Sequence, residues 1–267
     1  MLTIDGEPES YIEAAVIQTW IDAMKAEIES IIKNKTWKLV KKPAGVKPIG
    51  LKWIYKIKRN ADGTVIKYKA RLVAKGYVQQ QGIDFDEVFA PVARIETIRR
   101  LLALAATNGW EIHHLDVKTA FLNGDLNEDV YVTQPEGFVE KGKEDLVYKL
   151  SKALYGLRQA PRAWNIKLDR VLKEMEFTKC TKEPAEYQKK QKGELLIIAI
   201  YIDDLFVTGT SLNVIKQFKD YMSRRFEMSD LEMLTYYLGI EVTQGADGIR
   251  IKQGGYTQSI LVRTKMK

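Results

Sequence analysis

An apolar run that ends in two adjacent carboxylates constrains this chain most. Residues 195–200 are all aliphatic, and a run this apolar is typical of a strand that is buried on both faces. Asp203 and Asp204 follow almost at once, and a second apolar stretch begins at Leu205. This pattern predicts a hairpin with both carboxylates at its tip. An ionised carboxylate beside a buried strand is costly unless a cation pairs with it.

A third carboxylate, Asp116, decides between two interpretations of that tip. Asp203 and Asp204 alone would also suit an ordinary polar turn. Asp116, however, ends a short strand expected from about Trp110, directly after a helix that Asn108-Gly109 closes. Three carboxylates are the hard oxygen ligands that Mg²⁺ takes together with substrate phosphates. The sequence therefore indicates metal-assisted phosphoryl transfer.

Six sequence blocks stand in a fixed order along the chain. They are Lys69–Gly76, Phe89–Val92, Leu115–Gly124, Tyr155–Trp164, Tyr201–Asp204 and Tyr237–Val242. In this order they resemble the reverse transcriptase domain of copia-type long-terminal-repeat retrotransposon polyproteins. The resemblance runs from Glu7 to about residue 260, and the ordered series is far more specific than a lone Tyr-x-Asp-Asp.

The resemblance implies an α+β fold with the fingers and palm of a reverse transcriptase, and with most of the thumb missing. A polymerase without most of its thumb is expected to hold primer and template poorly. The implied segments are a helical lead-in at 1–36, fingers at 37–90 and 125–160, palm at 91–124 and 161–243, and a truncated start of the thumb or connection at 244–267.

The order of elements also predicts the palm without the resemblance. The strand that carries Asp116 is followed by a helix from Pro161, by the apolar hairpin and by a helix that Ser211 can cap. A last strand is expected over 235–243. This is the β-α-β-β-α-β order of a ferredoxin-like unit. The polar, aperiodic stretch 179–192 predicts a loop or a short irregular strand.

The N-terminal segment is expected to be helical and to carry no chemistry. Ser10 and Glu13 have the spacing of a capping box. Apolar residues then repeat at helical intervals, which predicts one buried helix face. These residues are Ile12, Val16, Trp20, Met24, Ile28 and Ile31.

Positive charge is concentrated in one part of the chain. The net charge is +7, yet residues 33–75 hold fourteen Lys or Arg and one acid, Asp62. Aromatic residues are interleaved with these cations, as expected for a phosphate-binding surface. A solvated basic face is the alternative. The cations, however, lie on strand-like segments at 53–58 and 65–73, which an Ala61-Asp62-Gly63 turn is expected to join.

The resemblance assigns the three carboxylates to two-metal nucleotidyl transfer. Asp116, Asp203 and Asp204 are the implied catalytic ligands of two Mg²⁺ ions, for which Mn²⁺ can substitute. Successive side chains on a strand point to opposite faces. We therefore expect Asp203 to be the metal-binding partner of Asp116, with Asp204 nearer the primer terminus.

Other roles in nucleotide binding follow from the resemblance alone. The basic strands correspond to fingers that close over the incoming nucleotide, so Lys69, Arg71 and Lys75 are candidates for triphosphate contact. Phe121 resembles the steric gate that selects deoxynucleotides, or else is an ordinary core aromatic. Gln159 matches the glutamine that lines the nucleotide pocket.

The resemblance also implies a primer grip at Leu238, Gly239 and Ile240, where a glycine lets the backbone approach the primer. The family commonly has glycine after the Asp-Leu that precedes this grip. This chain has Glu232 after Asp230-Leu231, which leaves the local turn in question.

The composition limits other classes of site. A single cysteine, Cys180, excludes an internal disulfide and suits a reducing compartment. His113 and His114 adjoin the Asp116 strand, but zinc is not favoured without a cysteine cluster. No signal pattern or bilayer-length apolar run is present, so we expect a cytoplasmic chain without a membrane partner. The oligomeric state stays open.

Two functions remain open. One is the RNA-directed DNA polymerase core of a copia-type retrotransposon, which extends a primer on an RNA or DNA template with deoxynucleoside triphosphates. The other is a non-catalytic retroelement relic that binds nucleic acid through its basic fingers. A different palm-fold nucleotidyl transferase would account for the carboxylates but not for the blocks at 69–76 and 159–164.

Overall fold

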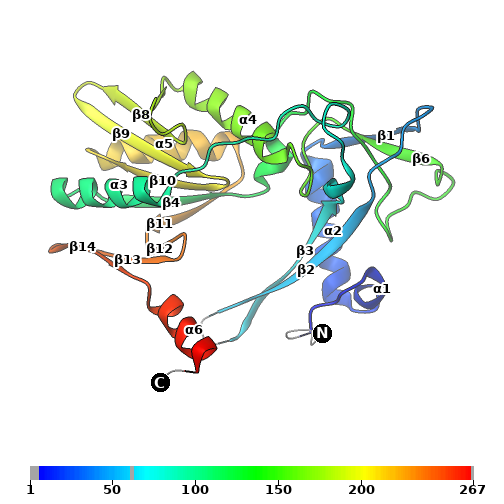
Figure 1. Ribbon diagram of the computed structural model, residues 1–267, viewed down its shortest axis with the longest axis horizontal. Coiled ribbons are helices and arrows are strands. Elements are labelled where there is room, and N and C mark those ends of the chain that lie inside the picture. The colour runs from blue at the N-terminus through cyan, green and yellow to red at the C-terminus, as the bar shows by residue number, and fades with distance from the viewer. Residues whose placement is uncertain (1–5, 61–62, 266–267) are drawn as a thin grey trace. The chain divides into compact units, whose positions relative to one another are not determined.

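Figure 1 shows a computed structural model of the chain, in which residues 6–60 and 63–265 are described. The chain divides into two compact units. Unit 1 comprises Met1–Ala90 and Phe121–Leu168, and unit 2 comprises Pro91–Ala120 and Asp169–Lys267. Both units mix helices with antiparallel sheet, in agreement with the expected α+β class. Among the described residues, no helix is both long and apolar enough to cross a bilayer.

Unit 1 is built from helices, a long two-stranded ribbon and a small three-stranded sheet ordered β1-β6-β5. Its elements are α1 (Tyr11–Ala14), α2 (Gln18–Lys33), β1 (Trp37–Lys41), β2 (Leu51–Arg59), β3 (Val65–Ala74), η1 (Gly76–Val78), β5 (Tyr131–Val132) and β6 (Leu146–Leu150). Two further helices, η2 (Ala120–Asn123) and α4 (Ala160–Glu174), cross the division between the units.

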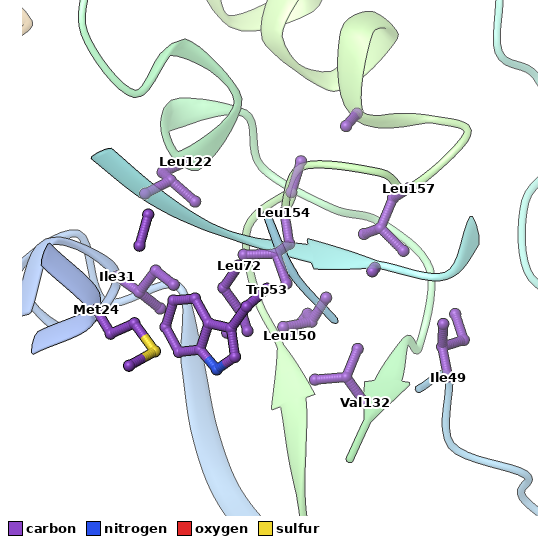
Figure 2. Close-up of a cluster of buried hydrophobic side chains, with 14 of the residues drawn as sticks. Met24, Ile31, Ile49, Trp53, Leu72, Leu122, Val132, Leu150, Leu154 and Leu157 are labelled. Atoms are coloured by element: carbon purple, nitrogen blue, oxygen red, sulfur yellow. The ribbon is translucent and has the colours of Figure 1, made fainter. Parts of the chain in front are cut away.

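The ribbon of β2 and β3 confirms the two predicted basic strands. The expected turn at residues 61–63 falls largely outside the described residues. One face of the ribbon packs on α2, where the Trp20 ring meets Tyr55 edge to face at 5.3 Å. Figure 2 shows Met24 and Ile31 of α2 in the same buried cluster as Trp53 and Leu72 of the ribbon. Apolar burial on this face leaves the charged face of the ribbon outward.

The N-terminal helix differs from the prediction in its buried face. Glu13 N donates to Ser10 Oγ at 3.3 Å, so the predicted cap forms. The helix is then interrupted before α2, because Ile17 is extended. Because of this break, the apolar residues before and after Ile17 no longer lie on one continuous helix face. Ile12 and Val16 are 74% and 82% exposed, whereas Trp20 and the later residues of the pattern mostly face the core.

Two glycines from different sequence blocks meet in unit 1. A Cβ on Gly76 would lie 2.0 Å from the carbonyl oxygen of Gly156. Gly156 itself has φ +89°, and a Cβ there would lie 2.2 Å from the Ala74 carbonyl oxygen. Ala74 N donates to Tyr155 O at 2.7 Å across the same contact. The end of β3 and the turn before α4 can therefore approach this closely only because both glycines lack a side chain.

Unit 2 is built on a six-stranded antiparallel sheet ordered β11-β4-β10-β9-β8-β7. Its strands are β4 (Ile112–Val117), β7 (Thr178–Lys179), β8 (Glu186–Gln191), β9 (Glu194–Tyr201), β10 (Asp204–Gly209) and β11 (Met228–Met233). The remaining elements are α3 (Ile95–Asn108), α5 (Leu212–Arg225), β12 (Tyr236–Tyr237), β13 (Ile240–Gly245), β14 (Gly248–Lys252) and α6 (Gly254–Thr264).

Both faces of this sheet are covered. Ile98 and Leu101 of α3 share a buried cluster with Ile112 and Phe206 of the sheet. Helix α5 packs against β9, β10 and β11, and Figure 1 shows it behind the first two strands. The predicted hairpin of β9 and β10 is thus confirmed as a strand pair buried between layers. Ser211 stands at the N-cap of α5 as predicted, although its side chain makes no capping hydrogen bond.

Two strand predictions in unit 2 are wrong. The stretch expected as a loop or a short irregular strand at 179–192 contains the regular strand β8, which pairs with β9 along its whole length. Its polar side chains find specific partners, since the buried Tyr187 hydroxyl donates to Asp169 Oδ1 at 2.7 Å. The last strand next to β4 is β11, and not the expected 235–243. That later stretch is divided into β12 and β13 by a turn at Leu238 and Gly239.

Glu232 adopts the backbone conformation that the expected glycine would favour. Its φ is +60°, in the left-handed region. It lies at an irregularity in the pairing of β11 with β4, between Asp230 and Met233. Glu232 N donates to Asp230 Oδ1 at 2.9 Å, which holds the turn. The chain thus keeps the bulge with a residue that is strained there.

Replacing Glu232 with glycine should raise the free energy of unfolding by about 1 kcal/mol. The left-handed conformation costs an ordinary residue roughly 1–2 kcal/mol, and the greater chain entropy that glycine loses on folding offsets only part of this gain. Chemical denaturation of parent and variant measures the change. Glu232→Ala is the matched control, since it removes the exposed carboxylate but keeps the Cβ. If Glu232→Ala stabilised the protein as much as Glu232→Gly, the effect would come from removal of the charge, and the backbone explanation would be wrong.

Gly76→Ala and Gly156→Ala should each destabilise the protein by about 2–3 kcal/mol, because a methyl group overlaps backbone atoms that cannot rotate away. Gly50→Ala is the control in the same unit, where the new Cβ would lie 3.3 Å from the flexible Lys75 side chain. Thermal unfolding of the three variants provides the comparison. Parental stability of Gly76→Ala would show that the two segments do not meet as described.

Candidate active site

The strand pair β4 and β10 brings two of the three predicted carboxylates together. Asp204 lies directly opposite Asp116 in the antiparallel register, so both side chains leave the same face. Val117 N donates to Asp203 O at 2.9 Å, which makes the next pair a hydrogen-bonded one. Asp116 and Asp204 are therefore a non-hydrogen-bonded pair, in which the Cα atoms are closest, about 4.5 Å apart.

Asp203 reaches the site from the turn and not from a strand. Tyr201 pairs with Asp204, which leaves Ile202 and Asp203 as a two-residue loop. Ile202 has φ +58°, a strained value for a β-branched residue. Because Asp203 lies in this loop, strand alternation does not set its direction relative to Asp204. That Asp203 is the metal-binding partner of Asp116 stays a prediction.

Asp204 is held by aromatic neighbours. Its Oδ1 lies 2.7 Å from His114 Nε2, and its carbonyl oxygen is 3.5 Å from the hydroxyl of Tyr237. The rings of His114 and Tyr237 meet edge to face at 5.3 Å. Burial raises the pKa of Tyr237 well above its usual range, and the negative charge of Asp204 adds to the effect. The tyrosine is therefore a neutral hydrogen-bond donor beside the carboxylates.

The three carboxylates fit a hard divalent cation by their chemistry. Among the described residues, no three His, Cys, Asp or Glu side chains lie close enough together to hold a metal ion. Asp116, Asp203 and Asp204 nevertheless offer carboxylate oxygens from adjacent strands and the turn beside them. Like charges directly opposite each other destabilise a sheet. A cation bound between Asp116 and Asp204 would remove this repulsion.

The two neighbouring histidines face different surroundings. His113 Nδ1 lies 2.9 Å from Lys219 Nζ, which also donates to both oxygens of Asp230. Glu111 lies 3.2 Å from the other ring nitrogen of His113. Burial lowers the pKa of His113, and the positive charge of Lys219 lowers it further. His114 contacts Asp204 instead, so the two rings have separate ionic partners.

The predicted primer grip forms a tight hairpin turn in unit 2. Tyr237 pairs with Ile240, so Leu238 and Gly239 are the two loop residues. Both have positive φ, +49° and +85°, as a type I′ turn requires. Glycine suits the second position, whereas Leu238 is strained there. The primer-grip role stays a prediction.

Unit 1 carries a ladder of opposed cations on the outward face of the ribbon. Lys56 pairs with Lys69 and Lys58 pairs with Lys67, each directly across the strands. Arg71 follows on the same face, opposite Ile54. Opposed like charges destabilise a ribbon unless an anion lies between them. Glu7 supplies part of that charge, since its carboxylate accepts from Lys56 Nζ at 2.6 Å.

A groove of about 440 Å³ lies along this ladder. It is lined by Ile54, Lys56, Lys58, Lys69, Arg71, Val73 and Tyr155. The guanidinium of Arg71 stacks over the Tyr155 ring at 4.5 Å, a contact that holds the charge toward the groove. Lys75 follows β3 beside Gly50 and does not line the groove. Sequence reasoning identified Lys69 and Arg71 but missed Lys56, Lys58 and Tyr155, although Lys56 and Lys58 alternate in β2 with residues of the buried face.

Gln159 and Phe121 have structural contacts in unit 1. Gln159 is buried, donates to Asp84 O at 2.9 Å and accepts from Gln79 Nε2 at 3.0 Å. Its amide thus ties the segment after η1 to the start of α4. The Phe121 ring packs against Tyr155 at 4.8 Å, next to the Arg71 stack. Neither observation tests the predicted roles in nucleotide binding, which stay predictions.

Comparison with known proteins identifies the family. The family described as reverse transcriptase (RNA-dependent DNA polymerase) matches residues 34–267. The chain is 40% identical over its whole length to the retrovirus-related Pol polyprotein from transposon TNT 1-94 of Nicotiana tabacum, and covers 21% of that protein. It is 40% identical over 99% of its length to the Pol polyprotein from transposon RE1 of Arabidopsis thaliana, and covers 18% of it.

A more distant relative is the Ty1-BL Gag-Pol polyprotein of Saccharomyces cerevisiae, at 26% identity over 84% of the chain and 13% of that protein. The chain thus spans about a fifth of the length of the plant relatives. The family match and the plant relatives confirm the resemblance drawn from the six blocks. This chain belongs to the reverse transcriptase family, and its relatives are the Pol polyproteins of copia-type retrotransposons.

Proposed function

We propose that this chain is the RNA-directed DNA polymerase core of a copia-type retrotransposon. The observation that carries the proposal is the register of β4 and β10, which sets Asp116 opposite Asp204 with Asp203 in the adjoining turn. In this proposal unit 2 is the palm and unit 1 is the fingers. The Pol polyprotein names of the relatives support the same assignment.

In the proposed reaction the carboxylates of unit 2 hold two Mg²⁺ ions. Bound Mg²⁺ supplies the charge that activates the primer 3′-hydroxyl and stabilises the leaving pyrophosphate. Asp116 and Asp203 are the proposed main ligands, and Asp204 lies nearer the primer terminus. Leu238, Gly239 and Ile240 present a tight turn to the primer backbone.

In unit 1 the cationic groove binds phosphate. Lys69 and Arg71 contact the triphosphate of the deoxynucleotide, and Lys75 at the end of β3 adds a third positive charge. Phe121 excludes a 2′-hydroxyl as the steric gate. Gln159 lines the nucleotide pocket and also anchors the segment after η1. Template strands are polyanions, so the same ladder also favours binding of RNA or DNA.

The ladder by itself supports a second function, which is nucleic-acid binding without catalysis. The phosphate backbone of any nucleic acid can neutralise the opposed lysines of the ribbon. This binding does not require that the carboxylates of unit 2 catalyse a reaction. Primer extension separates this function from the proposed polymerase.

Asp116→Asn and Asp203→Asn should each lower primer extension with Mg²⁺ by at least about 10²-fold, because each removes charge that stabilises the transition state. The assay follows extension of a DNA primer on an RNA template. Glu111→Gln, which changes a carboxylate on the same segment away from the proposed metal ligands, is the matched control. Extension by Asp203→Asn at the parental rate would refute its role as a main ligand. An inactive parent that still binds nucleic acid would favour the non-catalytic function.

Replacing Lys56 and Lys69 together by glutamine should weaken primer-template or nucleotide binding, and should flatten the salt dependence by about one unit for each phosphate that the variant no longer binds. The same change should leave the thermal stability nearly unchanged, since it removes a like-charged cross-strand pair together with the exposed Lys56–Glu7 ion pair. Affinities across a salt series and thermal unfolding measure the two effects. Lys143→Gln, outside the groove, is the control. If the variant bound both ligands with the affinity and the salt dependence of the parent, the ladder would be a solvated basic face and not a phosphate-binding surface.

A further inference from the structure

His114 makes a contact that the proposed function leaves without a role. It stands two residues before Asp116 on β4, so strand alternation places both side chains on one face. Its Nε2 lies 2.7 Å from Asp204 Oδ1. Because an ionised carboxylate only accepts hydrogen bonds, His114 is the donor in this pair. The bond engages Oδ1, one of the two carboxylate oxygens of Asp204.

The His114 ring is itself fixed in place. Its side chain is only 13% exposed, and Phe206 lies opposite it on β10. The ring of Tyr237, which is 2% exposed, packs against it edge to face. The ring cannot turn without opening this buried cluster. By contrast, the Asp204 side chain is 33% exposed, so less of its surface is packed against other residues.

We propose that His114 is a positioning residue, which orients the Asp204 carboxylate for divalent-metal binding by donating a hydrogen bond from Nε2 to Oδ1. The inference rests on the proposed function of the three carboxylates. A carboxylate that is held by an outer hydrogen bond loses less rotational freedom when it binds a cation. Removal of such outer-shell donors typically weakens metal binding about 10–100-fold. Tyr237 contributes by holding the His114 ring, since it packs against that ring from β12.

The neighbouring His113 shows that this arrangement is specific to one face of β4. Its ring contacts Lys219, and the two groups next to that contact are Glu111 and Asp230. None of these residues is among the proposed metal ligands. A change at His113 therefore disturbs an ionic cluster, whereas a change at His114 removes a donor to Asp204 itself.

The test compares Mn²⁺ affinity, measured by electron paramagnetic resonance on the full chain without nucleotide or primer. His114→Phe keeps a ring against Tyr237 but removes the donor, and should weaken Mn²⁺ binding about tenfold. His114→Gln restores an N–H donor and should lie within about threefold of the parent. In an Asp204→Asn background, His114→Phe should have little further effect, because the proposed role acts only through Asp204. Circular dichroism checks folding, and His114→Leu replaces the phenylalanine variant if that variant does not fold.

The inference would be overturned if His114→Phe bound Mn²⁺ as tightly as the parent, or more tightly. It would also be overturned if His114→Gln bound Mn²⁺ as weakly as His114→Phe. The inference would also be overturned if His114→Phe lowered Mn²⁺ affinity equally in the parent and in the Asp204→Asn background, because the loss would then reflect a general effect on the fold. These outcomes leave the proposed function standing if the parent extends primers. The proposed function fails separately if Asp116→Asn keeps parental Mn²⁺ affinity, and a parent that binds no Mn²⁺ overturns both.

Discussion

The antiparallel pairing of β4 with β10 is the interaction on which the candidate active site depends. It converts residues from distant parts of the sequence into direct neighbours, because Asp116 and Asp204 occupy one rung of the ladder. A shift of one residue would send one of these carboxylates to the opposite face. The register is held by the apolar residues of both strands, which pack between α3 on one side and α5 on the other. Burial of the hairpin thus sets the position of the charges at its tip.

Both units place like charges opposite one another where a neutral pair would be more stable. In unit 2 the pair is Asp116 and Asp204, and in unit 1 it is the ladder that begins with Lys56 and Lys69. Each arrangement sets like charges close together, and an ion of opposite charge bound there would offset their repulsion. Divalent cations suit the first and phosphates the second. Both surfaces suit the polymerase function proposed for this chain.

Backbone geometry explains several positions that side-chain chemistry does not. Gly76 and Gly156 belong to separate sequence blocks, and the structure shows that each is needed for the same close approach. Glu232 takes a left-handed conformation at the bulge of β11, with Asp230 as a hydrogen-bond partner. The irregularity lies where β11 pairs with β4, between Asp230 and Met233. Ile202 and Leu238 carry similar strain, and both lie in turns beside the candidate site.

The sequence alone determined the local patterns: the buried hairpin with Asp203 and Asp204, the basic strands around Lys69, and the order of blocks that identified the family. It did not predict β8 or β11, because their polar residues become strands only by pairing with β9 and β4. Tertiary structure likewise decided that Asp204 lies opposite Asp116, and that His114 Nε2 lies within hydrogen-bonding distance of the Asp204 carboxylate. Strand register and cross-strand contact join distant parts of the chain, so no local pattern encodes them.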